Sequence, residues 1–341
     1  MNIEIIDFSA IHSDSGRAKE ILAKRINEAA ISIGIFYVAG LGIDCSKVYE
    51  KSKEFHSKTK LYKENYLIGM NMRHAGYVPF SEKGMYSDEI GRRRYESFDL
   101  SLEKKHDNNE LNIFNGPINW PDIHEFRNIV YKYFTDMIYL SGEISKIMEI
   151  SLKVEPGSIH SKMTHPTSQL RLLHYIENDD STHRQDMNMG AHTDYECFTI
   201  LHQDSPGLQS QTRQGIWVDV PPIEKTFVMN IGDMLECLTN GYWKSNAHRV
   251  INRQKERFSI PFFASFNFNE SVAPLKEYAN RGDSSIVYKK IIAGEHLLEQ
   301  VARDFTYLRN LNSSGDIKLQ NGLPDSNFFQ ATVNMEVEMY D

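Results

Sequence analysis

Apolar positions in the first half of the chain recur at the spacing of helices. Over residues 15–30, and again over residues 123–150, they return mostly every three or four positions, which places them on one stripe of a helix. Between these two segments, residues 33–38 form a short apolar run that is typical of a buried strand. The stripe of the longer helix predicts that it packs on a large partner, and a sheet in the second half of the chain is the best candidate.

From residue 169 onward the pattern changes to short β-rich runs separated by turns. Ser205-Pro206-Gly207, Pro221-Pro222 and Asn230-Ile231-Gly232-Asp233 contain the residues that turns prefer. Many short strands with such turns favour a jelly roll or a barrel. The predicted fold class is α+β, mainly β, with the N-terminal helical region packed on the strands. We interpret Asn230 and Asp233 as turn residues.

We expect three regions within one structural unit. They are a mainly helical N-terminal region over residues 1–165, a strand-rich core over 166–275, and a C-terminal helix and tail over 276–341, with the helix expected over 278–308. With 341 residues, of which 40% are hydrophobic and 25% charged, the chain can bury one large core, although length alone would allow about two domains. Residues 310–341 show no pattern that predicts a structure.

Charge and cysteine content narrow the possible partners. The formal net charge is −8, which argues against a nucleic-acid surface because phosphate binding requires a concentrated basic face. The three cysteines are far apart and predict neither a disulfide framework nor a zinc knuckle. The N-terminus lacks the basic start of a signal peptide, and no run reaches the roughly 18 apolar residues of a membrane helix. We expect a cytoplasmic monomer or weak homo-oligomer that acts on a small molecule.

The most informative motif is His192-Thr193-Asp194, followed much later by His248. Residues i and i+2 of an extended strand point to the same side, so His192 and Asp194 can reach one metal ion while Thr193 faces the other way. Two imidazoles and one carboxylate can occupy one face of an octahedral Fe(II), which leaves three positions for a co-substrate and dioxygen. We therefore predict that His192, Asp194 and His248 bind iron.

A candidate carboxylate clamp follows the second histidine. Arg257 lies nine residues after His248, a separation that a strand, a turn and another strand can span. Its guanidinium group is a planar fork of donors that matches a carboxylate. Ser259 points to the same face of the strand and can add a hydroxyl donor. A short His-x-Asp motif is weak alone, and this second motif is what makes it specific.

Together these motifs resemble the isopenicillin N synthase-like family of Fe(II)/2-oxoglutarate-dependent oxygenases. The resemblance covers most of residues 1–300, and its most specific part runs over residues 248–263. Other parts of the family's pattern occur in the same order along the chain. They include Ile5-Ile6-Asp7-Phe8, Gly34-Ile35-Phe36-Tyr37-Val38, Gly76-Tyr77-Val78-Pro79, Gly116-Pro117-Ile118-Asn119-Trp120-Pro121, Trp217-Val218-Asp219-Val220-Pro221-Pro222 and Thr239-Asn240-Gly241.

The resemblance implies a double-stranded β-helix (jelly-roll) core that holds Fe(II) at the three residues named above. It also implies that Arg257 and Ser259 hold the far carboxylate of 2-oxoglutarate and that Tyr175 adds a hydroxyl contact. The implied enzyme is a dioxygenase that oxidises a C–H bond of a small organic substrate by hydroxylation, desaturation or oxidative cyclisation. Dioxygen is the second co-substrate, and succinate and carbon dioxide are the co-products. No catalytic side chain is expected beyond the metal ligands.

Two alternatives stay open at this point. An Fe(II) oxidase of the same fold needs no 2-oxoglutarate, and in it Arg257 and Ser259 would hold the carboxylate of the main substrate. A cupin-like binding protein would be non-catalytic, but it has no need of open iron positions. In the substrate cavity, we expect Phe266 and Asn267, because they follow the clamp strand by a few residues.

Overall fold

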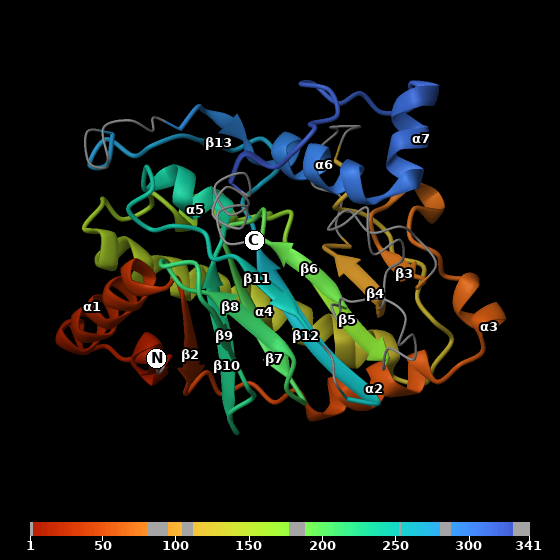
Figure 1. Cartoon of the computed structure of the whole chain (residues 1–341), viewed down its shortest axis with the longest axis horizontal. Coiled ribbons are helices and arrows are strands. Elements are labelled where there is room, and N and C mark those ends of the chain that lie inside the picture. The colour runs from red at the N-terminus through yellow and green to blue at the C-terminus, as the bar shows by residue number, and fades with distance from the viewer. Residues whose placement is uncertain are drawn as a thin grey trace.

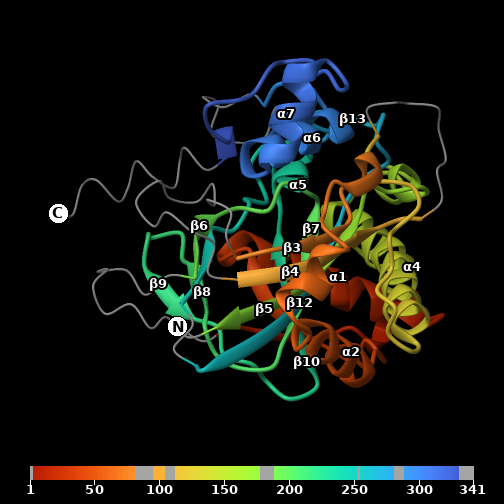
Figure 2. The same cartoon turned by 90° about the vertical axis from the view of Figure 1, so that its right-hand side faces the viewer.

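The computed structural model describes residues 3–80, 95–103, 112–176, 188–251, 254–279 and 288–329. Two sheets face each other, and a layer of helices covers the outer face of the larger sheet (Figures 1 and 2). The larger sheet has the strand order β1-β2-β10-β7-β12-β5-β4-β3, and the smaller sheet has the order β6-β11-β8-β9. This arrangement confirms the predicted mainly β jelly roll.

The strands of the larger sheet come from both halves of the chain. They are β1 (Ile5–Asp7), β2 (Ile35–Ala39), β3 (Gly76–Val78), β4 (Tyr95–Ser101), β5 (Gln169–Ile176), β7 (Phe198–Gln203), β10 (Thr226–Ile231) and β12 (Glu256–Ala264). The smaller sheet contains β6 (Met189–His192), β8 (Leu208–Gln211), β9 (Trp217–Asp219) and β11 (His248–Val250). A separate pair joins β13 (Ser271–Val272) to β14 (Ile291–Ile292). The N-terminal region therefore completes the sheet as well as supplying helices.

Helices form at the two amphipathic segments of the first half. Helix α1 spans Gly16–Ser32; the Ser15 hydroxyl caps it by accepting from the backbone N–H of Ala18, and Gly34 follows its end with a left-handed φ of +83°. Helix α4 spans Phe126–Leu152. The others are α2 (Ser46–His56), α3 (Lys60–Glu64), α5 (Asp233–Leu238), α6 (Ala293–Asp304) and α7 (Thr306–Ser314), with 3-10 turns at Ser9–His12, Met70–Met72 and His160–Met163.

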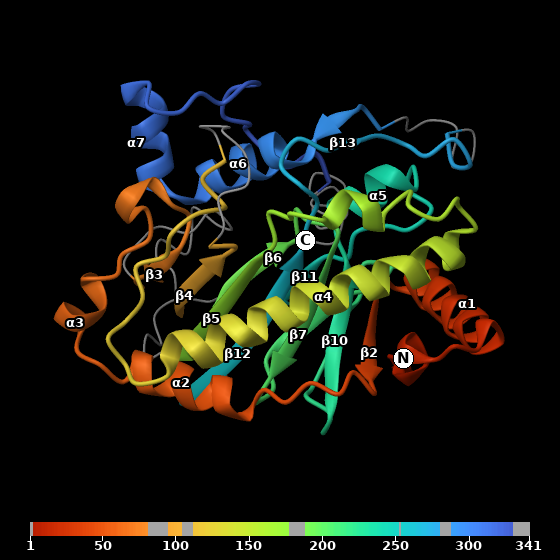
Figure 3. The same ribbon diagram turned by 180° about the vertical axis from the view of Figure 1, so that it is seen from behind.

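The main hydrophobic core lies between the larger sheet and the helix layer. Helix α4 crosses the back of the sheet (Figure 3), where the ring centroids of Phe134 and Phe262 lie 5.9 Å apart. Along β12, the even-numbered residues from Phe258 to Ala264 belong to this core. Because side chains alternate along a strand, the odd-numbered residues of β12 face the smaller sheet. That face forms the cavity described below.

The C-terminal region differs from the prediction of one helix over residues 278–308. Tyr278 lies in a turn and Ile291–Ile292 form strand β14, and residues 280–287 lie outside the described part. The helical pattern holds from Ala293 onward, but it is split at Phe305 between α6 and α7. Of the tail that had no prediction, residues 330–341 also lie outside the described part. Among the described residues, no helix combines the length and the apolar character that crossing a membrane requires.

Candidate metal centre

The structure brings His192, Asp194 and His248 together at one strand pair. Strand β6 ends at His192, strand β11 begins at His248, and the two strands pair antiparallel with these histidines opposite each other. Asp194 follows just beyond the end of β6, and all three side chains are buried. The pairing of β6 with β11 therefore brings together two motifs that lie far apart in the sequence.

The donor atoms of these three residues converge. His192 Nε2 lies 3.8 Å from Asp194 Oδ1, and His248 Nε2 lies 3.6 Å from the same oxygen. The two imidazole centroids are 4.3 Å apart. One ligand atom from each residue falls within 4.8 Å of the others. Two imidazole nitrogens and one carboxylate oxygen at this spacing form the donor set that non-haem Fe(II) sites use.

Backbone carbonyl groups fix how both imidazoles present their nitrogens. His192 Nδ1 lies 2.9 Å from the carbonyl oxygen of Gly190, and His248 Nδ1 lies 3.0 Å from that of Asn246. A carbonyl only accepts, so each Nδ1 must carry the proton and each Nε2 keeps its lone pair for the metal. Burial, reinforced by the neighbouring His248, lowers the pKa of His192 to about 3. The His192 imidazole is therefore neutral, as a metal ligand must be.

Two side chains hold the Asp194 carboxylate from behind. Asn230 Nδ2 donates to Asp194 Oδ2 at 2.8 Å, and the Thr199 hydroxyl donates to the same oxygen, which leaves Oδ1 for the metal. Burial raises the pKa of Asp194, but the two imidazoles and these hydrogen bonds outweigh burial and hold the pKa below its usual value. Asn230 is therefore a buried residue of β10 opposite Thr199, and its interpretation as a turn residue is wrong.

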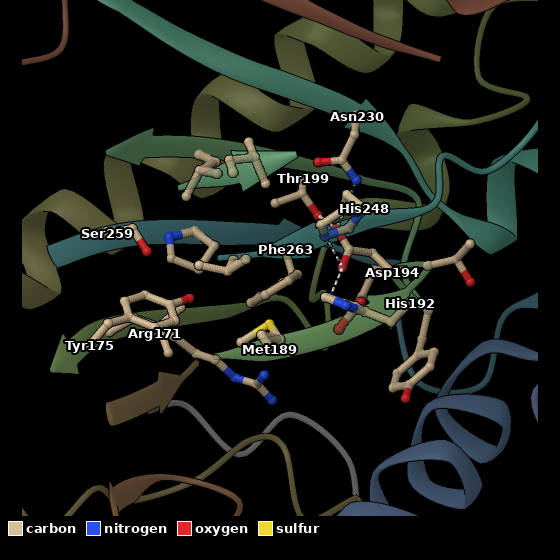
Figure 4. Close-up of a pocket in the computed structure, with 18 of the residues that line it drawn as sticks. Arg171, Tyr175, Met189, His192, Asp194, Thr199, Asn230, His248, Ser259 and Phe263 are labelled. Atoms are coloured by element: carbon tan, nitrogen blue, oxygen red, sulfur yellow. Dashed lines mark hydrogen bonds and ion pairs between the residues drawn. The ribbon is translucent and has the colours of Figure 1, made fainter. Parts of the chain in front are cut away.

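The predicted clamp residues Arg257 and Ser259 line the same cavity as the metal ligands. Figure 4 shows Ser259 and Tyr175 in this cavity. Arg257 of β12 is 1% exposed and lies opposite Tyr175 of β5, with its guanidinium carbon 4.8 Å from the Tyr175 ring centroid. Ser259 lies two residues further along the same strand face, and its hydroxyl is 3.5 Å from Arg257 Nη1. A carboxylate between these three side chains would meet a guanidinium group and two hydroxyl groups.

Other residues that the sequence did not reveal fix the position of Arg257. Its Nη2 donates to Gln203 Oε1 at 2.9 Å, and its Nε donates to the carbonyl oxygen of Ser205 at 3.2 Å. Gly207 has a φ of +144°, and a Cβ there would lie only 3.2 Å from Arg257 Nε. This glycine therefore leaves room for the guanidinium group. Because Nε and Nη2 are engaged in these hydrogen bonds, Nη1 is the guanidinium nitrogen that faces the Ser259 hydroxyl.

Two further ionisable residues, Arg171 and Glu196, line the cavity. Arg171 Nε lies 3.0 Å from Asp99 Oδ2, and its guanidinium carbon lies 5.2 Å from the Phe263 ring centroid. Burial, together with the Asp194 carboxylate, raises the pKa of Glu196 to about 8. Glu196 lies in the bend between β6 and β7, where the alternation of a strand does not apply, so no spacing in the sequence identified it.

Phe266 and Asn267 are not among the residues that line the cavity. Phe266 has the even parity of the core-facing side of β12 and is fully buried in the main core. Asn267 lies past the end of β12; its Oδ1 accepts from the backbone N–H of His165 at 2.6 Å, and its Nδ2 donates to the Thr164 hydroxyl at 3.1 Å. The structure therefore brings neither residue into the wall of this cavity: Phe266 faces the main core, and Asn267 lies beyond the end of β12.

Fold and cavity together define the class of non-haem iron oxygenases. Comparison with known families agrees: the 2OG-Fe(II) oxygenase superfamily matches residues 166–265, and the N-terminal family described as non-haem dioxygenase in morphine synthesis matches residues 3–123. The chain belongs to the 2OG-Fe(II) oxygenase superfamily, and the isopenicillin N synthase-like resemblance is confirmed.

Individual relatives cover nearly the whole chain. A homoarginine-6-hydroxylase of Arabidopsis thaliana is 30% identical over 327 residues, which are 89% of this chain and 98% of the relative. The 2-oxoglutarate-Fe(II) type oxidoreductase hxnY of Emericella nidulans is 30% identical over 77% of this chain and 79% of its own length. The crystal structure of a Neurospora crassa protein in complex with alpha-KG and thymine has a TM-score of 0.76 and 26% identity over 88% of this chain and 96% of that one.

These findings establish the reaction class. The protein is an Fe(II)- and 2-oxoglutarate-dependent dioxygenase that oxidises a C–H bond of a small organic substrate. They fit this activity and not the oxidase alternative that dispenses with 2-oxoglutarate.

Proposed function

We propose that His192, Asp194 and His248 are the ligands of the Fe(II) ion and that Arg257 and Ser259 bind the far carboxylate of 2-oxoglutarate. The observation that carries this proposal is that both groups line one cavity between the two sheets. A dicarboxylic co-substrate has one end to bind at a metal and another to bind at a cation, and this cavity offers both.

When bound, iron and 2-oxoglutarate supply the oxidising power for C–H attack with dioxygen and release succinate and carbon dioxide. The side chains of the cavity orient these reactants and exclude water. The two Nε2 atoms and Asp194 Oδ1 would hold the metal, while the hydrogen bonds from Asn230 and Thr199 keep Oδ2 engaged. Tyr175 adds its hydroxyl group beside Arg257; burial raises the pKa of Tyr175, so it stays a proton donor. Apolar side chains complete the wall around the clamp: Leu173, Met189, Leu201, Leu208 and Val250.

We further propose that the primary substrate lies beside Arg171, Glu196 and Phe263 and that it carries a polar or charged group. A guanidinium group and a carboxyl group in the wall of one cavity offer hydrogen-bond partners to polar or charged groups, which supports a polar substrate over a hydrocarbon. The test is oxygen uptake and succinate release with a panel that contains L-homoarginine, thymine and an uncharged terpene. Faster turnover with the terpene alone would contradict a polar substrate.

The cytoplasm remains our proposal for the compartment. Cys45, Cys197 and Cys237 are all free and buried, and such thiols persist in a reducing environment. We propose that the enzyme works as a monomer or weak homo-oligomer and binds no nucleic acid, which its net charge of −8 supports.

The ligand assignment is tested by iron binding. The His248→Ala variant should lose most of its affinity for Fe(II) and all its turnover, because one of three ligands is gone. His202→Ala is the matched control, since His202 pairs with the Tyr49 hydroxyl at 2.9 Å and does not line the cavity. Anaerobic Fe(II) titration should give wild-type affinity for the control. Wild-type affinity in His248→Ala would refute the assignment.

A further inference from the structure

The chain after helix α7 returns to the metal centre. Within residues 317–329, the buried side chains are those of Ile317, Leu319, Asn327 and Phe329. In Figure 1 this segment descends from α7 past α6 toward α5 and the middle of the molecule. Ile317 and Leu319 pack in a cluster with Leu297 of α6, and the Phe329 ring stacks on Tyr288 at 5.6 Å. Apolar contacts therefore hold both ends of the segment.

Asn327 is the polar exception among these buried residues, and it is fully buried. Its Nδ2 donates to Asp233 Oδ2 at 2.8 Å and to the Thr193 hydroxyl at 3.3 Å. Thr193 stands between His192 and Asp194 in the sequence, and its hydroxyl accepts this hydrogen bond. One amide group thus joins the C-terminal segment to the metal-binding segment.

Asp233, the other hydrogen-bond partner of Asn327 Nδ2, is also bonded to the metal-binding segment. Asp233 is the first residue of α5, and its backbone N–H donates to the carbonyl oxygen of Asp194 at 2.9 Å. Asn327 therefore contacts the metal-binding segment directly through Thr193 and, by one intervening residue, through the backbone of Asp194. These contacts reach Thr193 and the Asp194 backbone, and the conformation of these two residues determines how far His192 lies from Asp194.

The Asn327 Oδ1 atom accepts from the backbone N–H of Phe329 at 3.3 Å, so the amide also holds its own segment, but this bond does not account for the two bonds of Nδ2 to Asp233 and Thr193. A leucine of similar size would add apolar burial, whereas a buried amide loses its hydration and is tolerated only where hydrogen bonds replace water. We propose that Asn327 is a positioning residue of the iron centre: it fixes Thr193 and Asp233 so that His192 and Asp194 keep the geometry that binds Fe(II). The proposal rests on the ligand assignment made above.

The test measures Fe(II) affinity by anaerobic competition with a chromophoric chelator. Asn327→Leu removes the hydrogen bonds to Asp233 and Thr193 together with the one from the Phe329 backbone. Its Fe(II) dissociation constant should rise roughly tenfold, the lower end of what loss of an outer-shell partner costs. The double variant Asp233→Asn with Asn327→Asp reverses donor and acceptor and should recover most of the affinity. Unchanged affinity in Asn327→Leu would overturn the proposal.

A matched control separates positioning from loss of packing. Phe329→Leu reduces burial in the same segment, so it should lower the melting temperature of the metal-free protein and leave the Fe(II) affinity unchanged. Equal losses of Fe(II) affinity in Phe329→Leu and Asn327→Leu would overturn the proposal. Should Asn327→Leu fail to fold, Thr193→Val removes one acceptor at constant shape, and a smaller loss of Fe(II) affinity is expected because the bond to Asp233 remains. Wild-type affinity there would overturn the proposal as well.

The His248→Ala variant in the same titration keeps the two proposals apart. If it retains wild-type affinity, the ligand assignment itself fails. If it loses Fe(II) while Asn327→Leu does not, the ligands stand and only the role of Asn327 is refuted.

Discussion

At the scale of single residues, the sharpest consequence concerns Arg257. Removing its guanidinium group leaves a carboxylate without its charged partner in a buried site, a loss of about 2–5 kcal/mol. The Arg257→Ala variant should therefore bind 2-oxoglutarate about one to three orders of magnitude more weakly. Arg257→Lys should recover part of this, because an ammonium group keeps the charge but not the fork. Titration of 2-oxoglutarate into the anaerobic Fe(II) protein, followed by visible absorption, measures both.

The control for this prediction is Arg249→Ala. Arg249 lies in the other sheet, over the ring of Trp217 at 4.1 Å, and it does not line the cavity. Its loss should leave 2-oxoglutarate binding unchanged. Equal affinity in Arg257→Ala and the wild type would mean that Arg257 serves another carboxylate.

Short-range spacing made some site residues predictable and left others hidden. His192 and Asp194 share a strand face, and so do Arg257 and Ser259, so two-residue alternation was enough to group each pair. Gln203 could not be found in this way, because it reaches Arg257 from a neighbouring strand, and only the pairing of β7 with β12 brings them together. Proximity in sequence to the clamp strand did not place Phe266 in the cavity wall, because β12 ends at Ala264 and the Phe266 side chain then packs in the main core.

At the scale of secondary-structure elements, the β7–β8 turn shapes the clamp. A Cβ at Gly207 would lie 3.1 Å from the carbonyl oxygen of Ile251 and 3.2 Å from Arg257 Nε, and its φ of +144° is unfavourable for other residues. We expect Gly207→Ala to displace Arg257 and weaken 2-oxoglutarate binding, with the Fe(II) affinity unchanged. Separate titrations of the metal and the co-substrate check this.

Gly157→Ala is the matched control for the backbone strain that any side chain causes at a positive φ. Gly157 also has a positive φ, +97°, but nothing lies within 4 Å of a Cβ built there. It should lower stability without changing 2-oxoglutarate binding. Equal co-substrate binding in Gly207→Ala and Gly157→Ala would contradict a role for the turn in placing Arg257.

Amphipathic periodicity predicted the elements whose packing partner is large. Helices α1 and α4 formed within a few residues of their expected bounds because each buries one apolar stripe: α4 packs on the sheet and α1 packs mainly on α4. The C-terminal helix was predicted too long, because no local pattern indicates that Ile291–Ile292 pairs with β13 instead of extending α6. The boundaries at residues 166 and 276 remain our proposal.

At the scale of the whole molecule, buried histidines make stability depend on pH. Burial lowers the pKa of His56 to about 3 and that of His296 to about 4, from an ordinary 6.5. Below pH 6.5 the unfolded chain takes up protons at these residues while the folded protein does not until pH 3–4. The free energy of unfolding should therefore fall as the pH drops through this window, by about 1.4 kcal/mol per pH unit for each proton of difference.

Thermal unfolding of the metal-free protein between pH 7 and pH 5 tests this dependence. His56→Gln removes one of the titrating groups, so its melting temperature should fall less steeply with acid than that of the wild type. The exposed His124 supplies the control, and His124→Gln should keep the wild-type slope. An identical slope in His56→Gln and the wild type would show that His56 does not contribute.

The pairing of His192 with His248 has a mechanical consequence. Among the described residues, β6 is the outermost strand of the smaller sheet and β11 is its neighbour, so a metal ion held by both histidines is a reversible cross-link that fastens the edge of the sheet. Binding to the folded state alone adds about 2.7 kcal/mol at a hundredfold excess over the dissociation constant. Chelation should therefore speed amide hydrogen exchange in β6 before it does so in β10, and equal rates with and without Fe(II) would contradict this. Iron supply would then govern how long the enzyme survives as well as how fast it works.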